Sequence, residues 1–369
     1  MKKRACARNA FSVCILYIIL CVLLSGCGAR GGIAANVRPL ESLRLAETLG
    51  LDTGPTLSAA VAKTETEAAL ALSARAGSLP AAVDALREEC DSGTLFLGHL
   101  RYVLLGPEAA REGLAPLLDY MERDVEMRLD TELVLLDRPA EEFVCAEGTD
   151  LDVSEAVDAA KREAERQGNG LVLDLRETVV ALDEYGAAPV LLLHCEAPEG
   201  ETPSVQAAGC GVLRTDGAGA PRLVGTLDRR CAETLGLLLG RAGTLTREAG
   251  GATLFCRGGG EVRLLSAGNG VPRFQVSLRL SAAVAGMGDI AEAPEPETLA
   301  RELEAAFQTD AEALFARLQA LAADLPGLAR LLRNAGVEAG EGWLERSAFA
   351  VKVDVTIDRS FDTELLKKS

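Results

Sequence analysis

Apolar and polar positions in the first half of the chain follow two patterns, one typical of strands and one typical of helices. Short apolar runs predict buried strands at Thr56–Ala62, Thr94–Leu105, Thr131–Leu136, Leu171–Leu175 and Pro189–His194. Apolar residues that recur every three or four positions predict helices at Leu79–Cys90, Glu108–Asp124, Arg138–Cys145 and Ser154–Gln167. This order of strands and helices indicates an α/β arrangement with some parallel pairing.

The second half has strand candidates separated by glycine-rich turns. They are Gly211–Arg214, Arg222–Gly225, Thr253–Cys256, Glu261–Leu265 and Arg273–Val284. The glycine run Gly258–Gly260 is interpreted as a hairpin turn. Leucine and phenylalanine spacing predicts a long helix from Leu299 that Pro326 ends, and an alternating strand, AVKVDVTID, follows. We therefore expect an antiparallel sheet with a long helix on one face, and an α+β fold overall.

A polar segment with two prolines, EAPEGETPSVQA, is the best boundary between the halves. The length of 369 residues allows two or three domains. We expect a signal peptide, a tether, an N-terminal domain with room for two subdomains, a linker and a C-terminal domain. Their bounds are 1–26, 27–35, 36–197, 198–207 and 208–369.

The amino end has the form of an export signal. Met1–Asn9 carries four basic residues, and the uncharged, largely apolar run Ala10–Leu24 is shorter than the roughly 20 residues of a spanning helix. The run ends in Leu24-Ser25-Gly26-Cys27, which resembles a bacterial lipobox. That resemblance implies cleavage before Cys27 and diacylglycerol on its sulfur. It also implies a lipoprotein that carries palmitate. The alternative is an uncleaved anchor.

Charge and composition narrow the function classes. The 38 basic and 55 acidic side chains give a net charge of −17, which disfavours binding to nucleic acid. The chain has only two histidines and none of the common hydrolase, metalloprotease or kinase motifs. We therefore predict a protein that is not an enzyme and has no cofactor and no metal site.

Other reactive residues have structural interpretations. His99 lies in a predicted strand, and His194 neighbours Cys195 on a strand whose adjacent side chains point to opposite faces. The segment GLLLGRAGT, Gly236–Thr244, fits a helix and its C-cap better than a phosphate loop because the expected lysine is absent. Six further cysteines form no C-x-x-C pair, and both disulfides and buried thiols stay open: Cys90, Cys145, Cys195, Cys210, Cys231 and Cys256.

A dense cluster of mixed charge follows the predicted helix Glu108–Asp124. It includes Arg123, Asp124, Glu126 and Arg128. One interpretation is a structural clasp in which the two arginines pair with the nearby acids and fix the turn into the next strand. The other is a charged surface that docks on a partner. The sequence leaves both open.

The stretch Phe96–Val144 resembles the signature of the Ger(x)C family of spore germination lipoproteins. The matching positions are Gly98-His99, Gly106, Ala110, Gly113, Leu118-Asp119, Arg123-Asp124, Glu126 and Arg128. Gly209–Gly243 is similar to the opening of the family's C-terminal domain, and the closing segment around Trp343 resembles its end. Together with the lipobox, the resemblance covers nearly the whole chain.

This resemblance implies the C subunit of a GerA-type nutrient germinant receptor, required for receptor assembly or signalling. It implies lipid anchoring on the exported face of the inner spore membrane and assembly with integral membrane A-type and B-type subunits. The complex would sense nutrients and trigger release of ions and dipicolinate. The alternative is a solute-binding lipoprotein of a membrane transporter, which should have two similar lobes.

Overall fold

The computed structural model describes residues 43–61, 70–90, 93–146, 152–196, 204–217, 219–268, 271–287 and 295–358. Cys27, the predicted signal peptide and tether, and residues 198–203 of the predicted linker lie outside these ranges.

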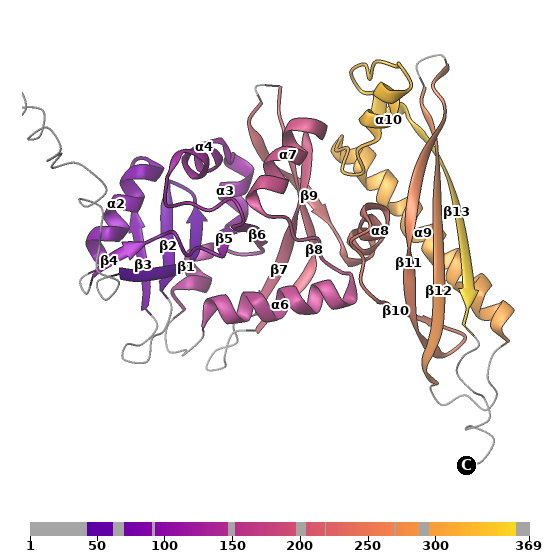
Figure 1. Cartoon of the computed structure of the whole chain (residues 1–369), viewed down its shortest axis with the longest axis horizontal. Helices are drawn as coiled ribbons and strands as arrows, with labels where there is room; N and C mark the ends of the chain where they lie inside the picture. Colours follow the sequence, from indigo (N-terminus) through magenta and orange to yellow (C-terminus); the bar gives the residue numbers. More distant parts are fainter. Residues whose placement is uncertain are drawn as a thin grey trace, which may run out of the picture. The chain divides into compact units, whose positions relative to one another are not determined.

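A nine-stranded mixed sheet occupies the first part of the chain (Figure 1). Its order is β3-β2-β1-β5-β6-β7-β8-β9, with β4 paired to β1. The four central strands β1, β5, β6 and β7 are parallel, and antiparallel strands flank them on both sides. The bounds are β1 Leu43–Asp52, β2 Thr56–Val61, β3 Leu70–Arg75, β4 Thr94–Phe96, β5 Tyr102–Leu105, β6 Glu132–Leu136, β7 Ala187–Glu196, β8 Ser204–Thr215 and β9 Pro221–Leu227.

Helices cover both faces of this sheet because the central strands are apolar on both faces. On β5, Val103 and Leu105 pack in one cluster with α2, α3, α4 and α7, whereas Tyr102 and Leu104 pack in the other with α5 and α6. The helices are α2 Leu79–Glu89, α3 Pro107–Glu112, α4 Ala115–Arg123, α5 Ala140–Val144, α6 Val153–Gln167 and α7 Leu175–Tyr185.

A second sheet has the order β10-β11-β12-β13, and α9 packs along one of its faces (Figure 1). Its strands are β10 Leu245–Ala249, β11 Ala252–Ser266, β12 Arg273–Met287 and β13 Ala348–Ile357. The helices of this part are α8 Arg229–Leu239, α9 Pro296–Leu321, α10 Leu328–Asn334 and α11 Trp343–Arg346. Phe349 of β13 stacks on Phe315 of α9 with ring centroids 4.2 Å apart, which fixes the strand to the helix. The α+β fold is confirmed.

Several predicted elements are divided in the structure. The predicted strand Thr94–Leu105 is β4 and β5, separated by a turn in which His99 is exposed, so its predicted place inside an apolar strand is wrong. The predicted helix Glu108–Asp124 is α3 and α4. Gly113 breaks it, because its φ of 136° lies outside the helical region.

Three predictions in other regions are also wrong. Leu171–Leu175 is not a strand, because Asp174 caps α7 there. Gly258–Gly260 is not a hairpin turn but the middle of β11, where a side chain on Gly258 would collide with the backbone of Arg279 on β12. The second sheet is not wholly antiparallel, since β13 pairs with β12 in parallel. By contrast, Gly240 caps α8 in the left-handed conformation, which confirms the helix and C-cap interpretation of GLLLGRAGT.

The strands on the two sides of the predicted linker pair with each other. β7 and β8 form an antiparallel ladder from Ala187↔Arg214 to Glu196↔Ser204, and β9 continues the same sheet. One apolar cluster joins Val212 of β8 to Phe274 and Val276 of β12. The domain boundary at 198–207 stays a prediction.

Candidate functional site

Asp124 and Glu126 of the predicted charged cluster organise the turn that follows α4. The Asp124 carboxylate accepts a hydrogen bond from the Glu126 backbone N–H at 2.8 Å, and the Met127 N–H donates to the Asp124 carbonyl. The Tyr120 hydroxyl also bonds to Asp124, and burial together with this bond raises the pKa of Tyr120. Asp124 therefore holds the end of α4 and the first residues beyond it.

Glu126 connects this turn to two other elements. Its carboxylate lies 3.2 Å from the Arg87 guanidinium on α2 and 3.5 Å from the Leu97 backbone N–H after β4. The Glu126 side chain is only 18% exposed, so the ion pair is partly shielded from solvent. Glu126 therefore pairs with Arg87, a cation outside the predicted cluster.

The two arginines of the cluster face solvent and pair with other acids than expected. Arg123 pairs with Asp119 at 2.7 Å, one helical turn earlier, and Arg128 forms a two-pronged pair with Asp130. These partners leave the Arg123 side chain 78% exposed and the Arg128 side chain 53% exposed. Among the residues that the structure describes, neither arginine pairs with Asp124 or Glu126. The cluster thus combines an inner acidic half with an outer basic half.

A cleft of about 720 Å³ lies beside this cluster, between the β1–β2 turn, the start of α2, and helices α3 and α4. We call it the α2–α4 cleft. Arg123 and Asp124 line it, whereas Glu126 and Arg128 do not. Its position at the carboxyl end of the parallel strand β1 is the usual place for a binding site in such sheets. Sequence reasoning missed it because its walls come from four separate segments.

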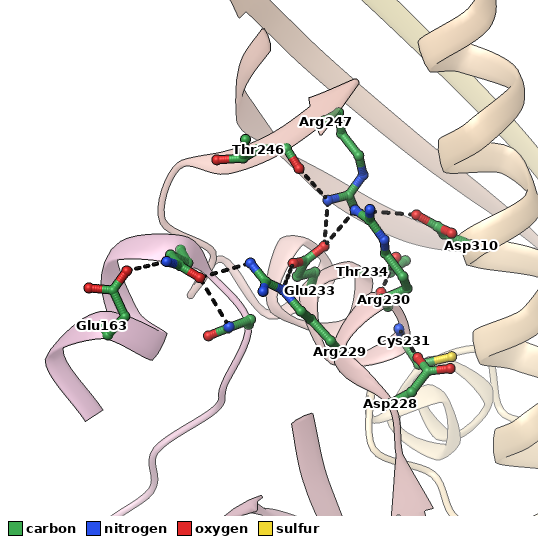
Figure 2. A network of polar contacts seen from close by, with 12 residues as sticks. Glu163, Asp228, Arg229, Arg230, Cys231, Glu233, Thr234, Thr246, Arg247 and Asp310 are labelled. Carbon is green, nitrogen blue, oxygen red and sulfur yellow. Dashed lines mark hydrogen bonds and ion pairs between the residues drawn. The ribbon is translucent and has the colours of Figure 1, made fainter. Parts of the chain in front are cut away.

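A buried ion network joins α8, β10 and α9 (Figure 2). The Arg247 guanidinium lies 2.6 Å from the Glu233 carboxylate and 3.2 Å from that of Asp310. Arg247 also lies over the Phe307 ring, 4.7 Å from its centroid. Arg247 and Glu233 have side-chain exposures of 4% and 1%, and burial raises the pKa of Asp310.

Sequence reasoning missed this network although a signal was present. Arg247 alternates with Leu245 and Ala249, both buried, so the period of the strand already places the arginine on the core face. Glu233 sits one helical turn before the buried Leu237 on α8. Two opposite charges at core positions of neighbouring elements indicate a buried pair. The network lies between α8, β10 and α9, and this position suits a structural role.

The structure separates the reactive side chains that could form a nucleophilic pair. His194 is exposed and its imidazole Nδ1 contacts Asp137, a hydrogen bond that raises the pKa of His194. Cys195 is buried, and burial raises the pKa of its thiol to about 12. The prediction that the two side chains point to opposite faces is confirmed. Five of the six cysteines after Cys27 are buried, and Cys145 is half-buried.

Within the residues that the structure describes, no group of three or more His, Cys, Asp and Glu side chains is arranged to hold a metal ion. No helix within the same ranges is long and apolar enough to cross a membrane.

The chain is similar to known spore germination proteins in sequence and in fold. Residues 36–193 match the family described as the spore germination protein N-terminal domain. The crystal structure of the GerBC protein superposes with a TM-score of 0.55 at 15% identity, over 86% of this chain and 99% of that one. At this identity the likeness shows the fold alone. No curated protein sequence matches the chain significantly.

Proposed function

Since the chain belongs to the Ger(x)C family of spore germination proteins, we propose that it is the lipid-anchored C subunit of a nutrient germinant receptor. The observation that carries the proposal is the family match over 36–193, which spans the first sheet from β1 into β7 and the whole charged cluster. The fold of the GerBC protein over 86% of the chain supports it.

The proposed anchor is diacylglycerol on Cys27. Its support is the order of basic residues, apolar run and Leu24-Ser25-Gly26-Cys27 at the amino end. Two acyl chains make membrane attachment stable where one chain is marginal. The mature chain would carry 34 basic against 55 acidic side chains, so attraction to anionic lipid would add little to the anchor. We place the protein on the exported face of the inner spore membrane, assembled with A-type and B-type membrane subunits.

The proposed role is in receptor assembly or signalling, without catalysis of its own. The buried ion network connects structural elements, and the buried thiols are held protonated, as the raised pKa of Cys195 and Cys210 to about 12 illustrates. A transporter's solute-binding lipoprotein should have two similar lobes, whereas the two sheets described here differ in strand number and pairing.

The experiment compares Cys27→Ala with the matched control Cys21→Ala, which replaces a cysteine of the apolar run. Both are made in the full-length chain, in a host strain that retains only this receptor. We expect Cys27→Ala to accumulate as an uncleaved precursor without lipid label, and the control to be processed normally. Dipicolinate release triggered by a mixture of amino acids, sugars and nucleosides should fall at least tenfold for Cys27→Ala.

Two outcomes would contradict the proposal at different points. Normal cleavage and labelling of Cys27→Ala would show that the lipobox assignment is wrong. Unchanged dipicolinate release from spores that lack the whole chain would show that it has no role in the receptor.

A further inference from the structure

The α2–α4 cleft has an acidic rim. Four carboxylates line it, those of Asp52, Glu112, Asp119 and Asp124, against the single guanidinium of Arg123, which gives a formal charge of −3. Arg123 is paired with Asp119 and therefore does not neutralise the other three. A concave surface with this excess of one sign attracts a cationic occupant.

The floor and walls of the cleft are apolar and stiff. Leu79 and Leu117, at 5% and 1% exposure, lie at the floor. Pro55, Pro80 and Pro116 contribute to the walls, and proline rings hold their backbone conformation fixed. Little conformational entropy is lost when such a surface is covered, which favours binding. The occupant that fits has apolar side chains beside its cationic ones.

The polar groups of the cleft favour a protein segment over a small ligand. Small-ligand sites orient their ligand with a few buried polar groups. Here the Asp119 and Arg123 side chains are 62% and 78% exposed, and Asp52 already accepts hydrogen bonds from the backbone N–H groups of Ala140 and Glu141. No lining side chain has a buried polar atom that lacks a partner. Rim charges around an apolar floor are instead the usual anatomy of a protein interface.

We propose that the α2–α4 cleft docks a segment of a partner receptor subunit that presents Lys or Arg side chains next to apolar ones. The apolar side chains pack on Pro80 and Pro116, which are exposed in the cleft, and the cations reach the carboxylates of Glu112 and Asp124. This inference rests on the proposed function and assigns one surface of the chain to assembly.

The test places a photo-crosslinking amino acid in the cleft of the full-length chain in spore membranes. Gly77 is the site, because it lines the cleft and a side chain there meets no atom within 4 Å. Gly340, which has the same open surroundings but does not line the cleft, is the matched control. We expect p-benzoylphenylalanine at Gly77, and not at Gly340, to crosslink a receptor subunit at a segment with at least two Lys or Arg residues among apolar ones.

Charge reversal then tests the acidic rim. Glu112→Lys should lower the crosslink yield from Gly77 at least fivefold, while Glu88→Lys should not change it. Glu88 is another exposed glutamate, on α2, and it does not line the cleft. A crosslink to lipid or to an acidic segment, an unchanged yield with Glu112→Lys, or no crosslink beyond the Gly340 control would each overturn the assignment. If Gly77 crosslinks nothing while spores lacking the chain still fail to germinate, only the cleft assignment fails and the receptor role stands.

Discussion

Neighbouring acids of one turn, Asp124 and Glu126, hold different parts of the molecule. Asp124 bonds to the turn itself, whereas Glu126 reaches Arg87 on α2 and the backbone of Leu97. Between them, Val125 is 98% exposed. The turn therefore has one side held by the hydrogen bonds of Asp124 and Glu126 and another side, at Val125, that is exposed to solvent. Substitutions on the two sides should have different effects.

Loss of the Glu126 carboxylate should destabilise the fold. Glu126→Ala leaves the partly buried Arg87 without this partner, which we expect to cost about 1–2 kcal/mol and lower the melting temperature by roughly 2–6 °C. Thermal denaturation followed by circular dichroism measures this. Glu122→Ala, on the exposed side of α4, is the matched control and should melt like the wild type. Equal melting of both variants would show that the Glu126–Arg87 contact contributes nothing.

His194 should make stability depend on pH. The hydrogen bond to Asp137 raises the pKa of His194 in the folded state above its ordinary value of 6.5. The stabilisation is complete below about pH 6.5 and is lost as pH rises through the raised pKa. The difference in melting temperature between pH 6 and pH 8 should therefore shrink in His194→Gln. His99→Gln, in an exposed turn, is the control, and an equal change in both variants would contradict the assignment.

At the scale of elements, the buried ion pairs of Arg247 connect β10 to α8 and α9. Glu233→Gln leaves the Arg247 guanidinium buried with only Asp310 as a charged partner, since Arg247 is 4% exposed. Breaking a buried pair in this way costs about 3–5 kcal/mol. We expect a correspondingly lower midpoint in urea denaturation. The double variant Glu233→Gln with Arg247→Met should be more stable than the sum of the two single changes predicts, and simple additivity would contradict the coupling.

Sequence patterns predicted the elements whose local and tertiary preferences agree. The helix Ser154–Gln167 and the apolar strand Thr131–Leu136 agree with α6 and β6 to within one residue at each end, and the long helix predicted from Leu299 is present as α9. The start of α7 was predictable in principle, because Asp174 and Glu177 form a capping box that outweighs the apolar run Leu171–Leu175.

Other features depended on contacts that the sequence alone does not reveal. The glycine run in β11 predicted a turn because glycine occurs both in turns and where neighbouring elements approach closely. A side chain on Gly260 would collide with Leu238 of α8. The glycine therefore allows α8 to pack close to β11 and does not bend the strand. Only part of the candidate site could be predicted from the sequence. Its charged residues were visible, but Arg87 and the prolines of the cleft come from distant segments.

At the scale of the whole molecule, the ladder between β7 and β8 bears on the predicted boundary at 198–207. A protease site placed within 198–203 and cut after folding should yield two fragments that stay together, because ten paired positions and a shared apolar cluster hold them. Size-exclusion chromatography of the cut and uncut protein, without denaturant, measures this. Separation of the fragments into two folded species would instead establish independent domains.

The parallel pairing of β12 with β13 has a consequence for how the chain reaches its folded state. Arg273 and Ala348 are paired although they lie 75 positions apart in the sequence, with α9, α10 and α11 in between. Synthesis from the amino end produces β12 before β13, and contacts so far apart along the chain form slowly. During that interval β12 is an open strand edge that other chains can join. Pairing with β13 covers this edge of β12 and makes β13 the edge strand of the sheet, so β12 stays exposed to other chains until β13 has paired with it.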